Sequence, residues 1–115
     1  PTTLEQIMDN LKSMAELARM NGIEPVLSSV LPAYDFPWRP GMEPAPKVMK
    51  LNAMIRDYAD AHDMIYLDYF SAMADDRNGL DSTLASDEVH PTVKGYEIMA
   101  PLAEAAIAKA LAKNK

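Results

Sequence analysis

The sequence has 115 residues and a mass of 12.7 kDa, which suits one small domain with a single hydrophobic core. Apolar residues make up 49% of the chain, yet no stretch approaches the roughly 20 uncharged apolar residues of a membrane-spanning helix. The net charge of −6, with acids and bases interleaved, excludes a basic footprint for nucleic acid. Because cysteine is absent, disulfides, thiolate metal sites and a cysteine nucleophile are excluded, while the cellular compartment stays open.

The N-terminal half of the chain predicts one helix, one strand and a long loop. Thr3 and Gln6 fit a capping box, and the apolar residues that follow recur at helical spacing, which predicts a helix near residues 3–20. A short apolar run bounded by glycine and proline predicts a buried strand near 24–31. Prolines then crowd residues 32–46, which predicts a stiff loop without regular structure.

The C-terminal half repeats the alternation. Amphipathic patterns predict helices near residues 45–62 and 92–112, with a second short strand near 64–68 between them. Asp68, at the end of this strand, is expected to cap one helical turn at 71–74. Alternating helices and strands predict an α/β protein with a parallel sheet, because parallel neighbours need crossover helices.

The loop before the last predicted helix carries Asp87 and His90, three residues apart. In a loop that closes a turn, this spacing can place a carboxylate against one imidazole nitrogen while the other nitrogen faces a cleft. Such a carboxylate orients the ring and stabilises the imidazolium that forms when histidine takes a proton from a serine hydroxyl. Pro91 stiffens the histidine backbone and the start of the helix. The motif alone is also typical of a surface pair or a helix cap, so its context decides.

That context resembles the C-terminal block of the SGNH hydrolases, also called GDSL-type esterases and lipases. The Asp-x-x-His-Pro sequence of residues 87–91 is followed by Lys-Gly-Tyr at 94–96, at the start of a helix. Residues 26–32 resemble the family's fourth strand and the loop that leaves it, and Asn52 and then residues 65–68 follow in the family's order. The resemblance spans essentially the whole chain but only the C-terminal half of the family's domain. It implies that residues 1–115 are a single partial domain, the C-terminal part of a flavodoxin-like three-layer α/β sandwich.

The resemblance also implies a chemistry. His90 would be the general base and then the general acid, with Asp87 as its orienting partner, in acyl transfer to water through a serine ester without a metal or an organic cofactor. The family's Gly-Asp-Ser and Gly-x-Asn-Asp motifs, which supply the nucleophile and oxyanion donors, do not occur in the sequence. The chain is therefore expected to be an inactive fragment of a serine esterase, and its start at Pro1, without a methionine, points to truncation.

The substrate and partners are predicted from the loop after the first strand. The resemblance implies removal of acetyl or other short acyl groups from sugars, or cleavage of lipid esters. Tyr34, Trp38 and Arg39 of the loop favour the carbohydrate ester, although Trp38 would equally suit covering its own loop. The unpaired sheet edge of a half domain is expected to pair with a second copy, forming a homo-oligomer. The alternative function is a non-catalytic α/β interaction module, in which Asp87 and His90 form a structural turn and the proline-rich loop binds a partner.

Three other features have structural interpretations. Ser28 and Ser29 end a strand, but no strand–turn–helix elbow surrounds them, so they are expected to be small, locally bonded residues and not nucleophiles. His62 is expected to close a helix, where its charge favours the dipole. A metal site that joins His62 and His90 to carboxylates has no supporting spacing.

Overall fold

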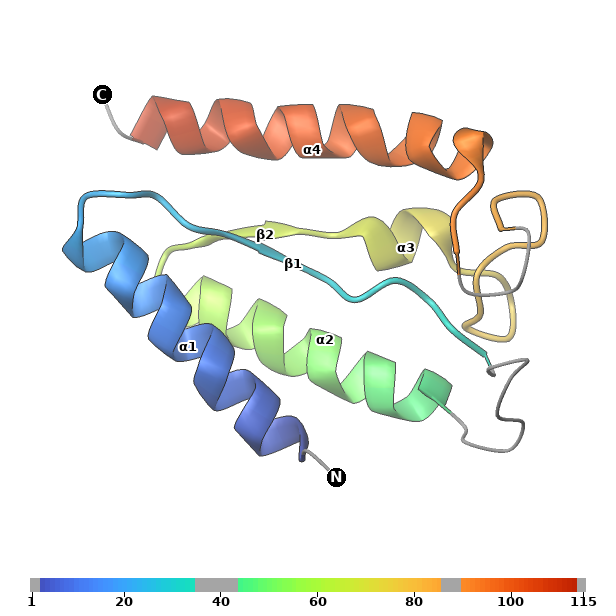
Figure 1. The fold of residues 1–115 in the computed structure, drawn as a ribbon, viewed down its shortest axis with the longest axis horizontal. Coiled ribbons are helices and arrows are strands. Elements are labelled where there is room, and N and C mark those ends of the chain that lie inside the picture. Colours follow the sequence, from blue (N-terminus) through green and yellow to red (C-terminus); the bar gives the residue numbers. More distant parts are fainter. Residues whose placement is uncertain (1–2, 35–43, 86–89, 114–115) are drawn as a thin grey trace.

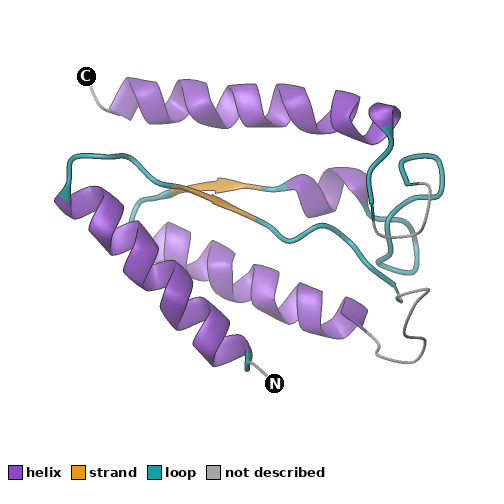
Figure 2. Ribbon diagram, in the orientation of Figure 1, coloured by secondary structure: helices purple, strands orange, loops and turns teal. Residues whose placement is uncertain are grey.

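The computed structural model describes residues 3–34, 44–85 and 90–113, and within them the chain forms a three-layer α/β arrangement. Two parallel strands lie at its centre (Figure 2). Helix α4 covers one face of the strands, and α2, with α1 packed beside it, covers the other (Figure 1). The predicted α/β class and parallel pairing are confirmed. The elements are α1 (Leu4–Met20), β1 (Val26–Ser28), α2 (Pro44–Ala61), β2 (Ile65–Leu67), α3 (Tyr69–Met73) and α4 (Val93–Lys113).

The two strands are shorter than the sequence predicts. Pairing runs only from Val26 opposite Ile65 to Ser28 opposite Leu67, not over residues 24–31 and 64–68. After Leu67 the chain leaves β2 and enters α3. Residues beyond β1 therefore have no neighbouring strand, apart from one more hydrogen bond, from the Ser29 N–H to the Leu67 carbonyl at 2.9 Å. A ladder ends where its partner turns away, and sequence patterns do not report that event.

The helix starts show how local chemistry sets the elements. The Thr3 hydroxyl accepts from the Gln6 N–H at 3.0 Å and the Gln6 side chain accepts from the Thr3 N–H at 2.8 Å, which confirms the capping box. Helix α2 begins at Pro44, so the predicted irregular loop over 32–46 is wrong at its C-terminal end. Proline fits there because first-turn N–H groups have no intrahelical acceptor.

Two hydrophobic clusters hold the layers together. The larger lies between the strands and the α1–α2 pair, and the smaller joins α3 and the segment after it to α4. Fully buried side chains in these clusters include Ile55 and Met73. The buried members of the larger cluster are Met8, Ala15, Leu27, Leu51, Ile55, Tyr58, Ala59 and Met64, and those of the smaller are Met73, Leu80 and Leu84.

Part of the apolar surface of α1 and α4 remains exposed. Along α4, Ala106 is buried, but Ile107 and Leu111 face solvent, with Leu111 60% exposed, so the apolar stripe predicted for this helix is only partly covered. On α1, Leu17 and Met20 are likewise exposed, Met20 to 82%. Within the described ranges, no helix combines the length and apolarity needed to cross a membrane.

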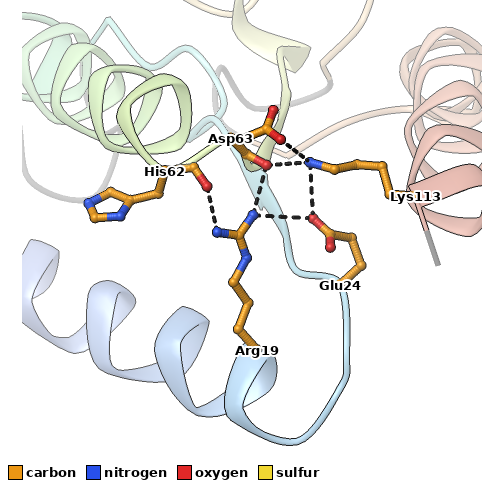
Figure 3. A network of polar contacts seen from close by, with 5 residues as sticks. All are labelled: Arg19, Glu24, His62, Asp63 and Lys113. Atoms are coloured by element: carbon orange, nitrogen blue, oxygen red, sulfur yellow. Dashed lines mark hydrogen bonds and ion pairs between the residues drawn. The ribbon is translucent and has the colours of Figure 1, made fainter.

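A polar network ties the elements together at the end where the strands begin (Figure 3). The Arg19 guanidinium, in the last turn of α1, donates to the carbonyls of His62 at 2.5 Å and Asp63 at 2.7 Å. The Lys113 ammonium, in the last turn of α4, donates to the same Asp63 carbonyl and lies 3.4 Å from Glu24 Oε1. Glu24 is 13% exposed, and its Oε1 also lies 3.6 Å from Arg19. The network therefore joins α1, the approach to β1, the α2–β2 turn and α4.

Candidate active site

The segments that leave the carboxyl ends of both strands gather at the opposite end of the molecule (Figure 1). They are residues 29–34 after β1, α3 with the turns that follow it after β2, and residues 90–92 before α4. In open α/β sheets, ligands bind at this edge, because the loops there converge and helix N-termini point toward it. The candidate site is therefore assembled from three separate stretches of the chain.

His90 is exposed and stands directly before Pro91 and the start of α4. The loop that presents it is closed at its base, where Ala85 and Pro91 form an antiparallel bridge and the Thr92 N–H donates to the Leu84 carbonyl at 2.8 Å. His90 thus lies on a short loop whose ends are held together. Its predicted partner Asp87 falls outside the described residues, so their pairing stays a prediction.

Residues 29–34 are held by polar side chains from two other elements. Asn52 of α2 accepts from the Val30 N–H at 2.7 Å and donates to the Val30 carbonyl at 3.1 Å, so its amide replaces a neighbouring strand. The Ser29 hydroxyl accepts from the Phe70 N–H at 3.0 Å, which fixes the start of α3 against the end of β1. Pro32 is fully buried just beyond. These contacts give the chain leaving β1 one defined path.

The two serines of this region have structural contacts. Ser29 is 5% exposed with its hydroxyl engaged by Phe70, and the exposed Ser28 donates to the Ser29 carbonyl at 2.9 Å. Both side chains therefore make local hydrogen bonds, as expected for small residues at a strand end. This arrangement does not resemble an activated nucleophile, which needs an adjacent general base.

Tyr34 is 47% exposed and packs against the turn that follows α3. Arg77 lies over its ring at 4.4 Å from the centroid, a distance that permits a cation–π contact. A Cβ at Gly79 would lie 2.8 Å from the Tyr34 Cβ, so only glycine allows this close approach. The other predicted substrate-binding residues, Trp38 and Arg39, lie outside the described residues.

Carboxylates shape the chain between α3 and the His90 loop. Asp75 Oδ1 accepts from the N–H groups of Arg77 and Gly79, both at 2.9 Å, and forms a tight turn. Asp81 Oδ1 accepts from the Thr83 hydroxyl at 2.7 Å and its N–H at 2.9 Å, and these bonds lower the pKa of Asp81. The Leu84 N–H donates to the Asp81 carbonyl at 2.8 Å, so this turn leads into the base of the His90 loop.

Asp68 acts as the predicted cap. Its Oδ1 accepts from the Ser71 N–H at 3.0 Å and its Oδ2 from the Ser71 hydroxyl at 2.5 Å, although the short helix it starts spans 69–73, not 71–74. A pocket of about 200 Å³ opens beside it, lined by Arg56 and Tyr66 among others. Burial, and then the negative charge of Asp68, raise the pKa of Tyr66.

His62 lies far from His90, at the other end of the sheet. It follows the last residue of α2, its ring centroid is 4.3 Å from that of Tyr58, and its carbonyl belongs to the network of Figure 3. The two histidines therefore do not meet in one site. Across residues 3–34, 44–85 and 90–113, no three His, Cys, Asp or Glu side chains are grouped so that they could hold a metal ion.

The model of the GDSL-like lipase/acylhydrolase family matches residues 1–98, from the start of the chain into α4, and so includes the His90 segment. The chain belongs to this family. The resemblance to the SGNH hydrolases, carried by the Asp-x-x-His-Pro block, is thereby confirmed. No curated protein is significantly similar to the chain.

Two solved structures are similar in sequence and fold. A GDSL-like lipase from Bacteroides thetaiotaomicron is 42% identical, with a TM-score of 0.89 over 94% of this chain and 54% of its own. A protein assigned as an acylhydrolase, from Bacteroides fragilis, is 36% identical, with a TM-score of 0.90 over 95% of this chain and 53% of its own. A third structure, of an acetyl-xylooligosaccharide esterase from Geobacillus, shares the fold at 18% identity. Its TM-score is 0.70 over 92% of this chain and 48% of its own. The chain thus spans about half the length of the proteins it matches.

Two residues of the site were not assigned roles from the sequence. Asn52 stands at a position where the helical pattern of α2 places buried residues, and a polar residue there is the signal of a required hydrogen bond. Gly95 stands inside α4, where glycine is unfavourable, which signals a close approach of backbone. Neither signal names the partner, which is Val30, 22 residues before Asn52, in one case and the base of the His90 loop in the other.

Proposed function

We propose that the protein containing this chain is a serine esterase that hydrolyses carboxylic esters, with His90 as its general base and acid. The observation that carries the proposal is the position of His90: in a chain of the GDSL-like family, it lies on a closed loop at the carboxyl edge of the parallel strands. Asp87 is its orienting carboxylate. The nucleophilic serine and the oxyanion donors belong to residues outside this chain, so the chain by itself does not turn over esters.

The proposed reaction has two acyl-transfer steps. His90 accepts the proton of the serine hydroxyl as the oxygen attacks the ester carbonyl, and then donates it to the departing alkoxide, leaving an acyl-enzyme. Water then attacks the acyl-enzyme while His90 takes its proton, and His90 returns that proton to the serine oxygen as the acyl–serine bond breaks and the acid is released. Asp87 holds the imidazole in the productive tautomer and stabilises its charged form, which is why its removal costs less than removal of the base itself.

The proposed substrate is an ester of a carbohydrate, with an acetyl or other short acyl group. Tyr34 supports it, because its half-exposed ring at the carboxyl edge of the strands offers a flat surface of the kind that sugars stack on. Trp38 and Arg39, close by in sequence, would extend this surface. The Geobacillus relative is an acetyl-xylooligosaccharide esterase, but at 18% identity it supports the shared fold and not the substrate.

The test is steady-state hydrolysis of p-nitrophenyl acetate and of acetylated xylo-oligosaccharides by the full-length protein. His90→Ala should lower kcat by about 10⁴-fold or more, and Asp87→Asn by less, because the base is removed in one case and only its orientation in the other. His62→Ala is the matched control and should keep the activity, since His62 lies at the opposite end of the sheet.

Retained turnover in His90→Ala contradicts the assignment of the base. A wild-type protein that hydrolyses neither ester contradicts the proposed activity and favours a non-catalytic role for the same fold. Hydrolysis of p-nitrophenyl acetate without any preference for the acetylated sugar contradicts the substrate alone.

A further inference from the structure

Gly95 is a buried glycine inside a long helix. Gly95 is the third residue of α4, and glycine within a helix is less favourable than alanine, because it loses more backbone freedom on folding and buries no side chain. The glycine therefore does not stabilise α4 as a helix. The reason for the glycine must therefore lie in what it contacts.

The contacts of Gly95 are with the base of the His90 loop. A Cβ at this position would lie 2.7 Å from the Leu84 carbonyl oxygen, which is shorter than side chains tolerate, and 3.0 Å from the Pro91 Cβ, which is a tight contact. The nearer atom belongs to the backbone and cannot rotate away. The same Leu84 oxygen accepts from the Thr92 N–H at 2.8 Å, so its place is fixed from two directions.

This close approach forms one unit from the helix and the loop. The first turn of α4 begins with the Thr92 hydroxyl accepting from the Gly95 N–H at 3.3 Å, and the Tyr96 N–H donates to the Thr92 carbonyl at 3.0 Å. Thr92 thus bonds back to Leu84 with its N–H and forward into the helix with its carbonyl. Ala85 and Pro91, the two ends of the loop, meet directly beside it.

We propose that Gly95 is a positioning residue for His90. By carrying no side chain, it lets α4 rest directly on the Leu84 carbonyl, closes the loop between Ala85 and Pro91, and sets where His90 stands relative to the strand ends. The expected effect of Gly95 on the rate rests on the proposed esterase activity, whereas its effect on the closure of the loop does not. A shift of about 1 Å in a catalytic group costs as much as 100-fold in rate, so one methyl group here matters.

Gly95→Ala in the full-length protein tests the proposal, because helix propensity and positioning predict opposite outcomes. Propensity alone predicts a higher Tm and unchanged kinetics. Positioning predicts a kcat at least ten-fold lower, with KM for the same ester within two-fold and no matching loss of folded protein by circular dichroism. The control is Glu97→Ala, which is exposed and two residues along, on another side of the helix, and should leave kcat unchanged. An unchanged kcat in Gly95→Ala overturns the proposal.

Amide hydrogen exchange tests the geometry without relying on activity. In the wild-type protein the Thr92 amide should be protected together with that of Tyr96, since the loop base and first turn form one unit. In Gly95→Ala, Thr92 should lose at least ten-fold protection while the C-terminal turns of α4 keep theirs. A wild-type Thr92 amide that exchanges freely beside a protected Tyr96 overturns the proposal, even where the variant does not fold. If the wild-type protein proves inactive but shows the expected exchange, the proposed function fails and the positioning role stands.

Discussion

Asn52 illustrates how single polar residues shape this site. Its amide bonds to both the N–H and the carbonyl of Val30, at the point where β1 has lost β2 as a partner. A backbone donor and acceptor without partners would cost free energy on leaving water, so the buried amide removes that cost and fixes the exit path of the chain. The position of a polar residue on the buried face was readable from the sequence. Its bonding to Val30 depends on the crossing of α2 over β1.

Asn52→Leu is expected to lower the free energy of unfolding by about 1–3 kcal/mol, because leucine keeps the approximate volume and leaves both Val30 groups without the amide. Urea denaturation of the variant beside the wild type measures the difference. Asn10→Leu, on the exposed face of α1, is the control and should change stability by no more than about 0.5 kcal/mol. Equal effects at positions 10 and 52 would show that the amide of Asn52 does not stabilise the loop.

Helix α4 connects the two ends of the sheet. Its N-terminal turn contacts the His90 loop, and its C-terminal turn carries Lys113, which bonds to Asp63 and pairs with Glu24 (Figure 3). Helical periodicity predicted this element to within one residue at each end. The sequence did not predict these two contacts, because the first joins Gly95 to Leu84, 11 residues earlier, and the second joins Lys113 to Asp63 and Glu24, 50 and 89 residues earlier.

Lys113→Met should lower the free energy of unfolding by about 1 kcal/mol, since methionine keeps the apolar stem but leaves the poorly exposed Glu24 paired, among the described residues, with Arg19 alone. Thermal melts of the wild type and the variant, at low salt and at 1 M sodium chloride, measure the difference in their stability. Salt should make this difference smaller, because it screens the ion pairs. Lys109→Met, an exposed position one turn earlier, should have little effect. A difference between wild type and Lys113→Met that grows with salt contradicts the electrostatic account.

The whole molecule presents apolar surface on both outer layers. Leu17 and Met20 of α1 and Ile107 and Leu111 of α4 face solvent, and among the described residues the edge of β1 away from β2 pairs with no strand. Monomeric proteins rarely expose such surface together with an unpaired strand edge. The chain also spans about half the length of its relatives.

The 115-residue chain on its own is therefore expected to associate with itself. Analytical ultracentrifugation from about 5 to 200 μM should show a mass that rises with concentration. The double variant Leu17→Glu, Ile107→Glu should reduce this association. Reversal of the charge at the exposed Asp9, by Asp9→Lys, should not reduce it. A monomer at every concentration with one cooperative unfolding transition contradicts this expectation.

The sequence by itself determined the element types, the α/β class and the family, because these depend on local periodicity, capping and one short motif of adjacent residues. The tertiary structure decided where each strand ends, which backbone groups Asn52 satisfies and why position 95 must be glycine. These features depend on contacts between different elements of the fold. Their distances follow from how helices and strands pack, so no local pattern of residues encodes them.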